Sequence, residues 1–321
     1  MSATNKKRQE RLSVVSPGSK KSMRYLVTGV TGQLGSEVAQ ELLSRGHEVF
    51  GTGRKEEPPA LLYGKNGFSY TAFDLADTDA LRAAFEKASP EAVIHCASWT
   101  AVDDAEKEEN RETVRKVNVE STGVLAKLCA KTSAKLLYVS TDYVFNGEGT
   151  APYEADSTDF DPLNVYGATK LEGEKVVRET LEKYFVVRVS WTFGRYGNNF
   201  VEKMIRASEG KEVVKVVDDQ FGTPTYTVDA AKGIADIVTS EKFGTYNLTA
   251  SGGYVSRAEF AGEIFKSVGI NVRIVPVKTA EFKSLAKRPL NSRLDSSKLE
   301  ALGFRALPDW RDGLKRYLAE R

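Results

Sequence analysis

A strand, a glycine-rich turn and a helix follow one another early in the chain, and this order constrains the fold more than any other feature. The strand is Arg24–Thr28, the turn is Gly29-Val30-Thr31-Gly32-Gln33-Leu34-Gly35, and a helical pattern covers Ser36–Arg45. We expect the first glycine to permit a tight turn, the second to admit a diphosphate, and the third to let the helix pack on the strand. The helix N-terminus would attract the anion. The stretch therefore predicts a dinucleotide-binding βαβ unit.

Strands and helices continue to alternate after this unit. Strands are predicted at His47–Thr52, Phe185–Ser190 and Val213–Val217, and a third strand ends at Phe73-Asp74-Leu75. The stretches Ala92–Ser98 and Leu136–Phe145 are each predicted as a strand with the loop that follows it. Helices are predicted at Asp77–Lys87, 109–131 and Phe200–Ser208. Such alternation predicts an α/β fold, a Rossmann-type doubly wound parallel sheet with a smaller C-terminal α/β substrate-binding region.

Ligands of such sheets bind at the carboxyl ends of the strands. Asp74, after the third strand, could reach an adenine ring, and the loop Trp99–Glu106, after the fourth, could line the site. His95 lies within an apolar strand, so we expect a core histidine. Asn118 could fix a backbone group or a water behind the site, or lie on a helix surface.

The end of the second strand bears on the cofactor. NAD-binding units carry an acidic residue there, which holds the ribose 2′-OH. Here the chain reads Gly53-Arg54-Lys55, so no carboxylate competes and two cations could receive a 2′-phosphate. We expect NADPH rather than NADH, with NADH possible and an ordinary loop role for both charges left open.

Tyr166 and Lys170 are four residues apart, which on a helix places them one turn apart on the same face. A phenol normally ionises near pH 10, and a nearby ammonium would lower that pKa. Such a tyrosine could give a proton to a carbonyl oxygen or take one from an alcohol. Thr141, at the end of the fifth strand, could hydrogen-bond the same oxygen. Taken alone, the pair is more typical of a half-buried helix-start aromatic and a solvated charge, and the rest of the chain favours the catalytic interpretation.

Composition excludes several classes of protein. The two cysteines, Cys96 and Cys129, provide neither a disulfide framework nor a metal spacing and suit a cytoplasmic protein. With His47 and His95 as the two histidines, we expect no histidine-ligated metal. No apolar run approaches the roughly 20 residues of a membrane span, so we expect no membrane partner.

Charge is uneven along the chain. Residues 1–22 hold six of the 46 basic residues but one of the 44 acidic ones, so the rest is slightly acidic and we expect no nucleic-acid partner. We interpret 1–22 as a disordered basic leader and 23–190 as the dinucleotide-binding domain. Residues 191–321 would be mainly substrate-binding, with some chain returning to the core.

Seven further motifs occur in order along the chain, namely Ala101–Glu106, Ser140–Gly147, Leu163–Gly167, Arg188–Trp191, Gly197–Phe200, Asp219–Thr225 and Arg288–Leu294. With the glycine turn and Tyr166-x-x-x-Lys170, they resemble the extended short-chain dehydrogenase/reductases and, within these, the dTDP-4-dehydrorhamnose reductase family. The resemblance covers residues 23–321.

This resemblance implies NAD(P)H-dependent reduction of dTDP-4-dehydro-L-rhamnose to dTDP-L-rhamnose, for bacterial surface polysaccharide. Hydride would reach C4 while Tyr166 protonates the forming alkoxide, Lys170 lowers the Tyr166 pKa and binds the nicotinamide ribose, and Thr141 orients the oxygen. Cofactor contacts would come from Gly29, Gly32, Gln33, Leu34, Gly35, Arg54, Asp74, Leu75, Ala97, Ser98, Tyr166 and Lys170. Substrate contacts would come from Thr100, Val102, Asp103, Asp142, Tyr143, Trp191, Arg288 and Asn291.

Within that set the resemblance gives some residues a role. Asp142 and Tyr143 would touch the sugar, and Trp191 would stack on it. Arg288, Asn291 and Arg293 would hold nucleotide or diphosphate, with a surface role for any of them left open. The family motif usually has Asp where Asn146 stands, which affects one loop contact.

Rival interpretations use the same scaffold. The 4,6-dehydratases place an Asp-Glu pair after the strand-end threonine, whereas this chain has Asp142-Tyr143, which disfavours dehydration. Another NDP-sugar 4-ketoreductase stays open. So does a non-catalytic regulatory subunit resembling the β subunit of methionine adenosyltransferase. The expected assembly is a monomer or a homodimer, and no metal set is identifiable.

Overall fold

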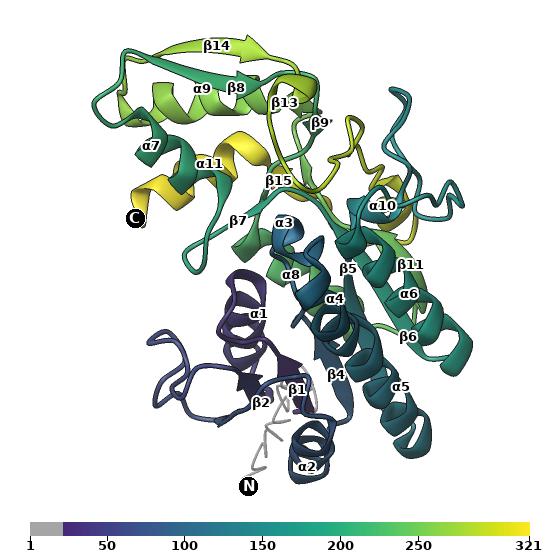
Figure 1. The fold of residues 1–321 in the computed structure, drawn as a ribbon. Coiled ribbons are helices and arrows are strands. Elements are labelled where there is room, and N and C mark those ends of the chain that lie inside the picture. The colour runs from purple at the N-terminus through teal and green to yellow at the C-terminus, as the bar shows by residue number, and fades with distance from the viewer. Residues whose placement is uncertain (1–21) are drawn as a thin grey trace, which may run out of the picture.

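The computed structural model describes residues 22–321, so the predicted basic leader lies outside the described residues except for Ser22. A parallel sheet with helices on both faces forms the larger part of the molecule, and a smaller C-terminal lobe carrying α7, α9 and α11 lies beyond one end of it (Figure 1). The fold predicted from the sequence is confirmed.

The main sheet has seven strands in the order β11-β6-β5-β4-β1-β2-β3, all paired in parallel. These are β1 (Arg24–Thr28), β2 (Glu48–Gly53), β3 (Phe68–Ala72), β4 (Ala92–His95), β5 (Lys135–Thr141), β6 (Tyr184–Val189) and β11 (Gly244–Asn247). The chain runs outward from β1 to β3 on one side and from β4 to β6 on the other. The strand order therefore reverses between β1 and β4, which is where open α/β sheets bind their ligands.

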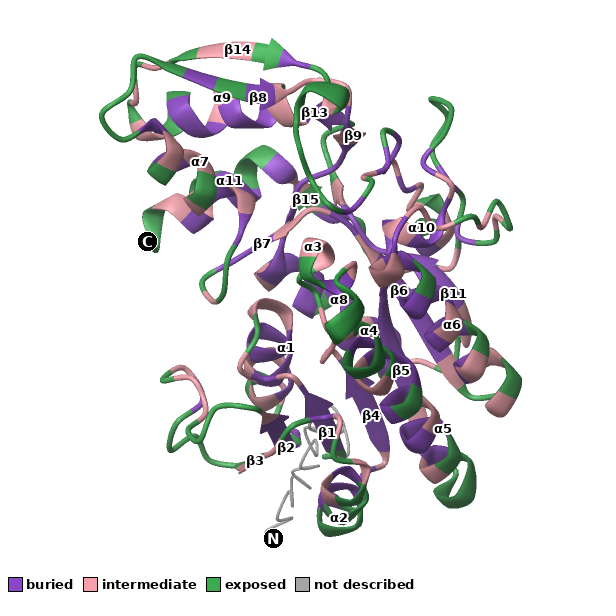
Figure 2. Cartoon of the chain, viewed as in Figure 1, coloured by how far each residue is buried: buried purple, intermediate pink, exposed green. Residues whose placement is uncertain are grey.

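Helices cover both faces of this sheet. They are α1 (Gln33–Ser44), α2 (Thr78–Ala88), α4 (Glu108–Arg115), α5 (Ser121–Thr132), α6 (Val165–Thr180) and α8 (Thr227–Val238). One apolar cluster joins the sheet to α1 and α8, and Val38 and Ile234 are members of it. The other joins it to α2, α5 and α6, with Leu81 and Leu125. The inner strands are accordingly buried, whereas the edge strand β3 and the outer helix faces are partly or fully exposed (Figure 2).

The C-terminal lobe has a core of its own, built around Phe193, Phe260 and Trp310. Its elements are β7 (Thr192–Phe193), α7 (Phe200–Ser208), β8 (Val213–Val217), β9 (Phe221–Gly222), β10 (Thr225–Tyr226), β12 (Ala250–Ser251), β13 (Val255–Ser256), α9 (Arg257–Val268), β14 (Arg273–Val277), β15 (Leu307–Asp309) and α11 (Trp310–Ala319). The short helix α10 (Ser297–Ala301) packs instead against β11 of the main sheet. The stretch after residue 190 also supplies α8 and β11 to the main sheet.

Most predicted elements are present, and α2 buries Leu81, Ala84, Phe85 and Ala88 as its pattern predicts. Three predictions need correction. The expected loop Trp99–Glu106 contains the short helix α3 (Val102–Ala105), whose first turn carries two acidic residues that favour a helix N-terminus. The third strand ends at Ala72, before the predicted Phe73-Asp74-Leu75.

The third correction concerns the long helix predicted over 109–131. It is α4 and α5 joined by a π-helical turn, Lys116–Glu120. A π turn adds a residue to one turn of the helix, and a periodic pattern does not reveal it. Asn118 lies in this turn and is 1% exposed. No helix within residues 22–321 is both long enough and apolar enough to cross a membrane.

Candidate functional site

The glycine turn after β1 has the geometry that its sequence predicts. Gly29 has φ +74°, a conformation that glycine adopts without strain. A Cβ on Gly29 would lie 2.9 Å from the Cα of Ala97, at the end of β4. A Cβ on Gly35 would lie 2.3 Å from the carbonyl oxygen of Gly29. Close approach is therefore the reason for glycine at the first and third positions.

The N-terminus of α1 fits the diphosphate of a dinucleotide. Gly32 is its N-cap residue, no side chain caps the helix, and its first turn holds no acidic residue. The first backbone N–H groups thus lack a capping side chain, and the helix dipole favours an anion there. Arg54 is exposed just beyond β2, where a 2′-phosphate could reach it.

Other predicted cofactor residues lie around this turn and the neighbouring strand ends. Leu75 is buried, while Asp74 is exposed and its Oδ1 accepts a hydrogen bond from the Ala76 N–H. Ala97 and Ser98 are half-buried after β4. The Nε2 of Gln33 lies 3.4 Å from the Asn198 carbonyl oxygen, so Gln33 reaches the loop before α7. Leu34 is half-buried beside it.

Helix α6 brings Tyr166 to the end of β5. Asn164 caps this helix, with its Oδ1 accepting from the Gly167 N–H at 2.8 Å. A Cβ on Gly167 would lie 2.2 Å from the carbonyl oxygen of Tyr143, so the first turn of α6 packs directly on the segment after β5. The rings of Tyr143 and Tyr166 meet edge to face at 5.8 Å. The Thr141 hydroxyl lies close enough to the Tyr166 phenol to lower its pKa, so the structure brings these two predicted residues together.

Burial raises the pKa of the Tyr166 phenol well above its ordinary value, and the charges of Asp142 and Tyr143 raise it further. The nearby Thr141 hydroxyl opposes this rise in the pKa. The phenol is therefore protonated at neutral pH, the state in which it can donate a proton.

Lys170 is a buried cation that donates to the strand β5. Its side chain is 2% exposed, and its Nζ donates to the Val139 carbonyl oxygen at 2.7 Å, 3.9 Å from the centre of the Tyr138 ring. Burial lowers the Lys170 pKa to about 7, and the charge of Glu174 opposes that fall. The Thr141 hydroxyl lowers the Tyr166 pKa here, and the expected effect of Lys170 on that pKa stays a prediction.

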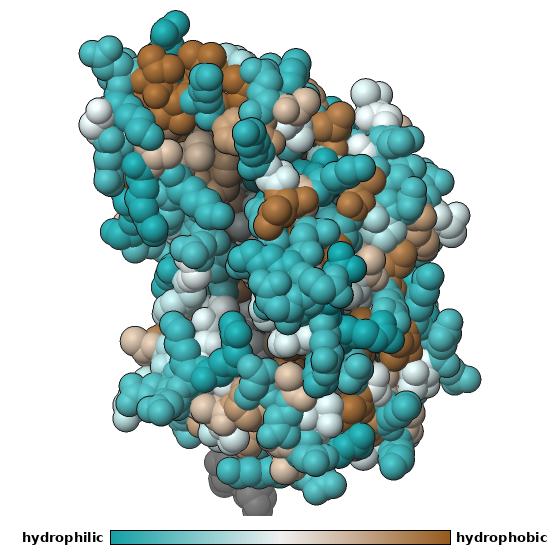
Figure 3. All heavy atoms as spheres, viewed as in Figure 1, coloured by the Kyte–Doolittle hydropathy of each residue, from teal (hydrophilic) through white to brown (hydrophobic). Residues whose placement is uncertain are grey.

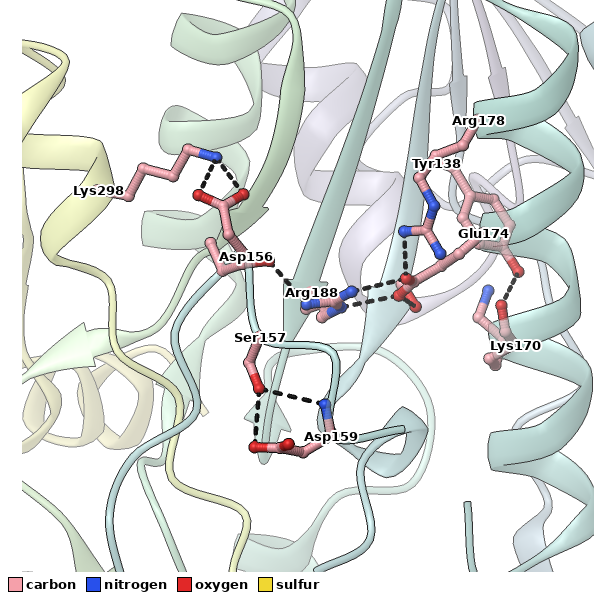
Figure 4. A network of polar contacts seen from close by, with 11 residues as sticks. Tyr138, Asp156, Ser157, Asp159, Lys170, Glu174, Arg178, Arg188 and Lys298 are labelled. Atoms are coloured by element: carbon pink, nitrogen blue, oxygen red, sulfur yellow. Dashed lines mark hydrogen bonds and ion pairs between the residues drawn. The ribbon is translucent and has the colours of Figure 1, made fainter. Parts of the chain in front are cut away.

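A buried ion-pair network lies behind the site, on the same helix as Lys170 (Figure 4). Arg188 on β6 donates through Nε and Nη2 to the two carboxylate oxygens of Glu174, at 2.9 and 2.8 Å. Ser140 and Arg178 also donate to Glu174, and the third Arg188 nitrogen donates to the Ala155 carbonyl. Sequence reasoning did not identify Glu174, although its spacing of four residues from Lys170 could have suggested a shared face.

Residues behind β4 are structural. His95 is 1% exposed, with ring nitrogens 2.7 and 3.1 Å from the hydroxyls of Thr28 and Thr122, so the predicted core histidine is confirmed. Asn118 accepts from the Trp99 N–H at 2.8 Å and donates to the Thr169 hydroxyl at 2.9 Å. Of its two open alternatives, the structure shows the one in which its amide fixes a backbone group.

Two residues after β6 and β13 form a second aromatic contact near the site. Trp191 has φ +47°, which is rare for a residue with a side chain. The Arg257 guanidinium lies over its ring, 3.5 Å from the centre. The sequence predicted that Trp191 stacks on a sugar, but a guanidinium already covers one face of it. Arg257 was missed because an arginine at the first position of a helix resembles an ordinary surface charge.

The remaining predicted substrate residues divide into two groups. Arg288 pairs with Asp103 through Nη2 at 2.6 Å and Nη1 at 3.1 Å, which ties the 279–290 segment to α3. Val102, on α3, is half-buried, and Thr100 is exposed before it. The side chain of Asn291 is buried, and its amide donates to the carbonyls of Glu148 and Ala151.

Internal contacts thus use the donors of Asn291, and its Oδ1 accepts from Arg293. The structure gives this residue a role in joining two loops, and the Arg293 guanidinium lies 4.4 Å from the centre of the Phe221 ring. In the part of the chain that is described, no three His, Cys, Asp or Glu side chains form a metal-binding group. The space-filling view shows the surface drawn in between the C-terminal lobe and the larger part (Figure 3).

Comparisons with known proteins agree with this geometry. The chain matches the family described as RmlD substrate binding domain over residues 23–321. It is 39% identical over 298 residues to the dTDP-4-dehydrorhamnose reductase of Streptomyces griseus, covering 91% of each chain. It is 35% identical to the spore coat polysaccharide biosynthesis protein SpsK of Bacillus subtilis, covering 93% of this chain and 98% of that one.

A solved structure shows the same fold. The dTDP-4-dehydrorhamnose reductase of Bacillus anthracis, in complex with NADP, superimposes with a TM-score of 0.82 at 34% identity, covering 94% of this chain and 100% of that one. The resemblance inferred from the motifs is confirmed, and the chain belongs to the RmlD substrate binding domain family.

Proposed function

We propose that this chain reduces the 4-keto group of dTDP-4-dehydro-L-rhamnose to give dTDP-L-rhamnose, with NADPH as reductant. Support comes from the family, from relatives named dTDP-4-dehydrorhamnose reductase, and from the similar structure that holds NADP. The observation that carries the proposal is the half-buried, protonated phenol of Tyr166, which lies beside the Thr141 hydroxyl at the carboxyl edge of the sheet.

The residues at the glycine turn fit the cofactor, as described above. Gly29, Gly32 and Gly35 would admit the diphosphate to the N-terminus of α1, and Arg54 would meet the 2′-phosphate. Lys170 would bind the nicotinamide ribose. Bound there, NADPH would supply a hydride to the keto carbon.

Tyr166 and Thr141 would act on the keto oxygen. Negative charge grows on this oxygen as the carbon is reduced, so a donor placed there stabilises the transition state more than the ground state. The neutral Tyr166 phenol donates its proton to the forming alkoxide, and the Thr141 hydroxyl orients the same oxygen. Tyr143 and the Asp103–Arg288 pair, next to this point, would hold the substrate.

The test uses purified full-length protein with dTDP-4-dehydro-L-rhamnose and NADPH. Reduced-nicotinamide absorbance should fall, and Tyr166→Phe should lower kcat by about 10²- to 10⁴-fold, the usual contribution of a general acid. NADPH binding to this variant, followed by fluorescence, should fall far less than kcat, because the other predicted cofactor contacts remain. Tyr63→Phe is the matched control, because Tyr63 is 69% exposed and lies far along the chain from Tyr166 and Thr141. The proposal fails if the wild type consumes no NADPH with this substrate.

A further inference from the structure

A carboxylate from a distant part of the chain holds the start of the helix that carries Tyr166. Glu106, the C-cap residue of α3, is half-buried, and its side-chain Oε1 accepts a hydrogen bond from the Val165 N–H at 2.7 Å. Val165 is the first residue of α6 and immediately precedes Tyr166. The two partners are 59 residues apart in the sequence. This bond therefore fixes α6 against α3, which packs on it (Figure 1).

The bond is additional to the ordinary cap of the helix. A helix is usually capped by its own N-cap residue, and Asn164 already does this by accepting from the Gly167 N–H. Glu106 accepts from a different N–H of the first turn, which would otherwise lack a partner within the helix. A negative charge is favourable at this end of a helix. The neighbouring cation, Lys107, pairs with Asp104 rather than with Glu106.

The backbone on both sides of Tyr166 is held in place. The hydroxyl of Thr169, one turn further along α6, donates to the carbonyl oxygens of Val165 and Tyr166, each at 3.0 Å. Asn118 in turn donates to that hydroxyl at 2.9 Å. Two segments outside α6 therefore restrain the first turn of this helix, the π-helical turn through Asn118 and the end of α3 through Glu106.

The segment that carries Glu106 is itself anchored. Asp103, within α3, accepts a hydrogen bond from the Ala286 N–H at 3.1 Å. Asn164, at the start of α6, donates through Nδ2 to the Lys287 carbonyl oxygen at 2.9 Å. The same short stretch of chain thus contacts both α3 and the start of α6. The Glu106 carboxylate consequently projects from a fixed backbone, as a residue that positions another must.

We propose that Glu106 is a positioning residue for the reduction, because it determines where the first turn of α6 places the Tyr166 hydroxyl relative to Thr141. This inference rests on the proposed function. A general acid must lie within hydrogen-bond reach of the oxygen that it protonates. Without the carboxylate, the Val165 N–H is released, the first turn of α6 shifts, and the phenol moves with it. A misplacement of about 1 Å can cost about 10²-fold in rate.

The test compares Glu106→Ala with Glu106→Gln in the full-length protein, using dTDP-4-dehydro-L-rhamnose and NADPH. The alanine variant should lose about 10- to 100-fold in kcat, with little change in KM for NADPH. The glutamine variant should keep most of the activity, because its amide oxygen can accept from the same N–H. Glu109→Ala is the matched control, since Glu109 is exposed on α4, and it should behave as the wild type.

Single turnovers separate positioning from a loss of folded protein. With enzyme in excess over NADPH and substrate saturating, the rate constant of NADPH oxidation reports the reaction within the complex. A preparation that merely contains fewer folded molecules keeps this rate constant. Glu106→Ala should lower it by the same factor as kcat. An unchanged rate constant would show that Glu106 only stabilises the fold, and the inference would be wrong.

The same measurement in the Tyr166→Phe background completes a cycle. Because Glu106 acts through the phenol, Glu106→Ala should add no further loss there. Additive losses would overturn the inference, and so would a glutamine variant as impaired as the alanine variant. If the wild type oxidises NADPH and Glu106→Ala matches Glu109→Ala, the inference alone is wrong. If the wild type oxidises none, the proposed reduction is wrong and the inference with it.

Discussion

Two acid–arginine pairs lie close to Lys170 and Thr141, and they differ in whether the two side chains form hydrogen bonds with each other. In the first, Glu174 and Arg188 are 0% and 1% exposed in their side chains and share two hydrogen bonds. Burial alone would raise the pKa of Glu174, but the hydrogen bonds and charge of Arg188 hold it below its ordinary value. In the second, Asp142 and Arg257 do not touch, and burial raises the pKa of Asp142 to about 6.

This difference distinguishes a pair that stabilises the fold from a pair that still has groups open to a ligand. A charged pair whose hydrogen bonds are all filled within the chain can only hold elements together, as Glu174 and Arg188 hold α6 to β6. A pair with groups left open is unfavourable in the empty protein and becomes favourable when a ligand completes it. Three measurements test this contrast, beginning with the largest expected effect.

Removing one partner from the closed pair should have a large effect on stability. Glu174→Ala leaves Arg188 buried without a counter-charge, and we expect a loss of about 3–5 kcal/mol in the free energy of unfolding. Urea denaturation measures it. The matched control is Glu172→Ala on the same helix, whose ion pair with Arg115 is 40–51% exposed and should cost less than about 1 kcal/mol. Equal losses in the two variants would show that Glu174 is not a closed structural pair.

The Asp142–Arg257 pair, whose side chains do not bond to each other, should affect the free energy of unfolding in the opposite direction to the Glu174–Arg188 pair. The folded pKa of Asp142 lies above the ordinary value of 3.8, so its charge destabilises the fold above about pH 6, and this penalty disappears as pH falls from about 6 to 3.8. We expect Asp142→Asn to be more stable than the wild type at pH 8, by roughly 2–3 kcal/mol. The gap should narrow at pH 5.

The comparison variant for this series is Glu174→Gln. Because the folded pKa of Glu174 is lowered, its contribution is complete above its ordinary value of 4.5 and is lost only at lower pH. The deficit of Glu174→Gln should therefore stay constant between pH 8 and 5, measured by urea unfolding at each pH. If the differences in unfolding free energy between each variant and the wild type changed with pH in the same way for Asp142→Asn and Glu174→Gln, the contrast between the two pairs would be wrong.

The smallest effect concerns a cation that is exposed and needs no partner in the empty protein. Arg54→Ala should leave stability unchanged and raise KM for NADPH more than for NADH. The difference should be about 1 kcal/mol, or about fivefold, because solvent screens a contact at the surface. Steady-state kinetics with both cofactors measures it. Equal effects on the two cofactors would remove Arg54 from the 2′-phosphate site.

Predictions from the sequence were most successful where a short stretch of residues determines both the local structure and the position of the site. The glycine turn, α2 and the order of the strands follow from apolar periodicity and from the conformational freedom of Gly29, and both are visible in the sequence. The approach of Tyr166 to Thr141 was also predictable, because one residue begins a helix and the other ends a strand. The comparisons confirm the family that these motifs indicated.

What the sequence could not show depends on contacts between distant segments. The turning of Lys170 towards Val139 depends on which carbonyl of β5 faces α6. The stacking of Arg257 on Trp191 joins residues from separate elements of the lobe, and the strained backbone of Trp191 has no sequence signature. Asn291 was predicted as a ligand contact because its motif matched, yet its role between two loops depends on carbonyls contributed by another segment.

The edge strand β11 has a consequence for how this protein is made. It pairs with β6, but it comes much later in the chain, after the first elements of the C-terminal lobe. The helix α8, which precedes β11, packs against α1. While a nascent chain emerges from the ribosome, the outer edge of β6 and one side of α1 stay open until residue 247 has been synthesised. Unpaired strand edges promote misassembly between chains. Translation must therefore pass well into the C-terminal half before the nucleotide-binding half can close.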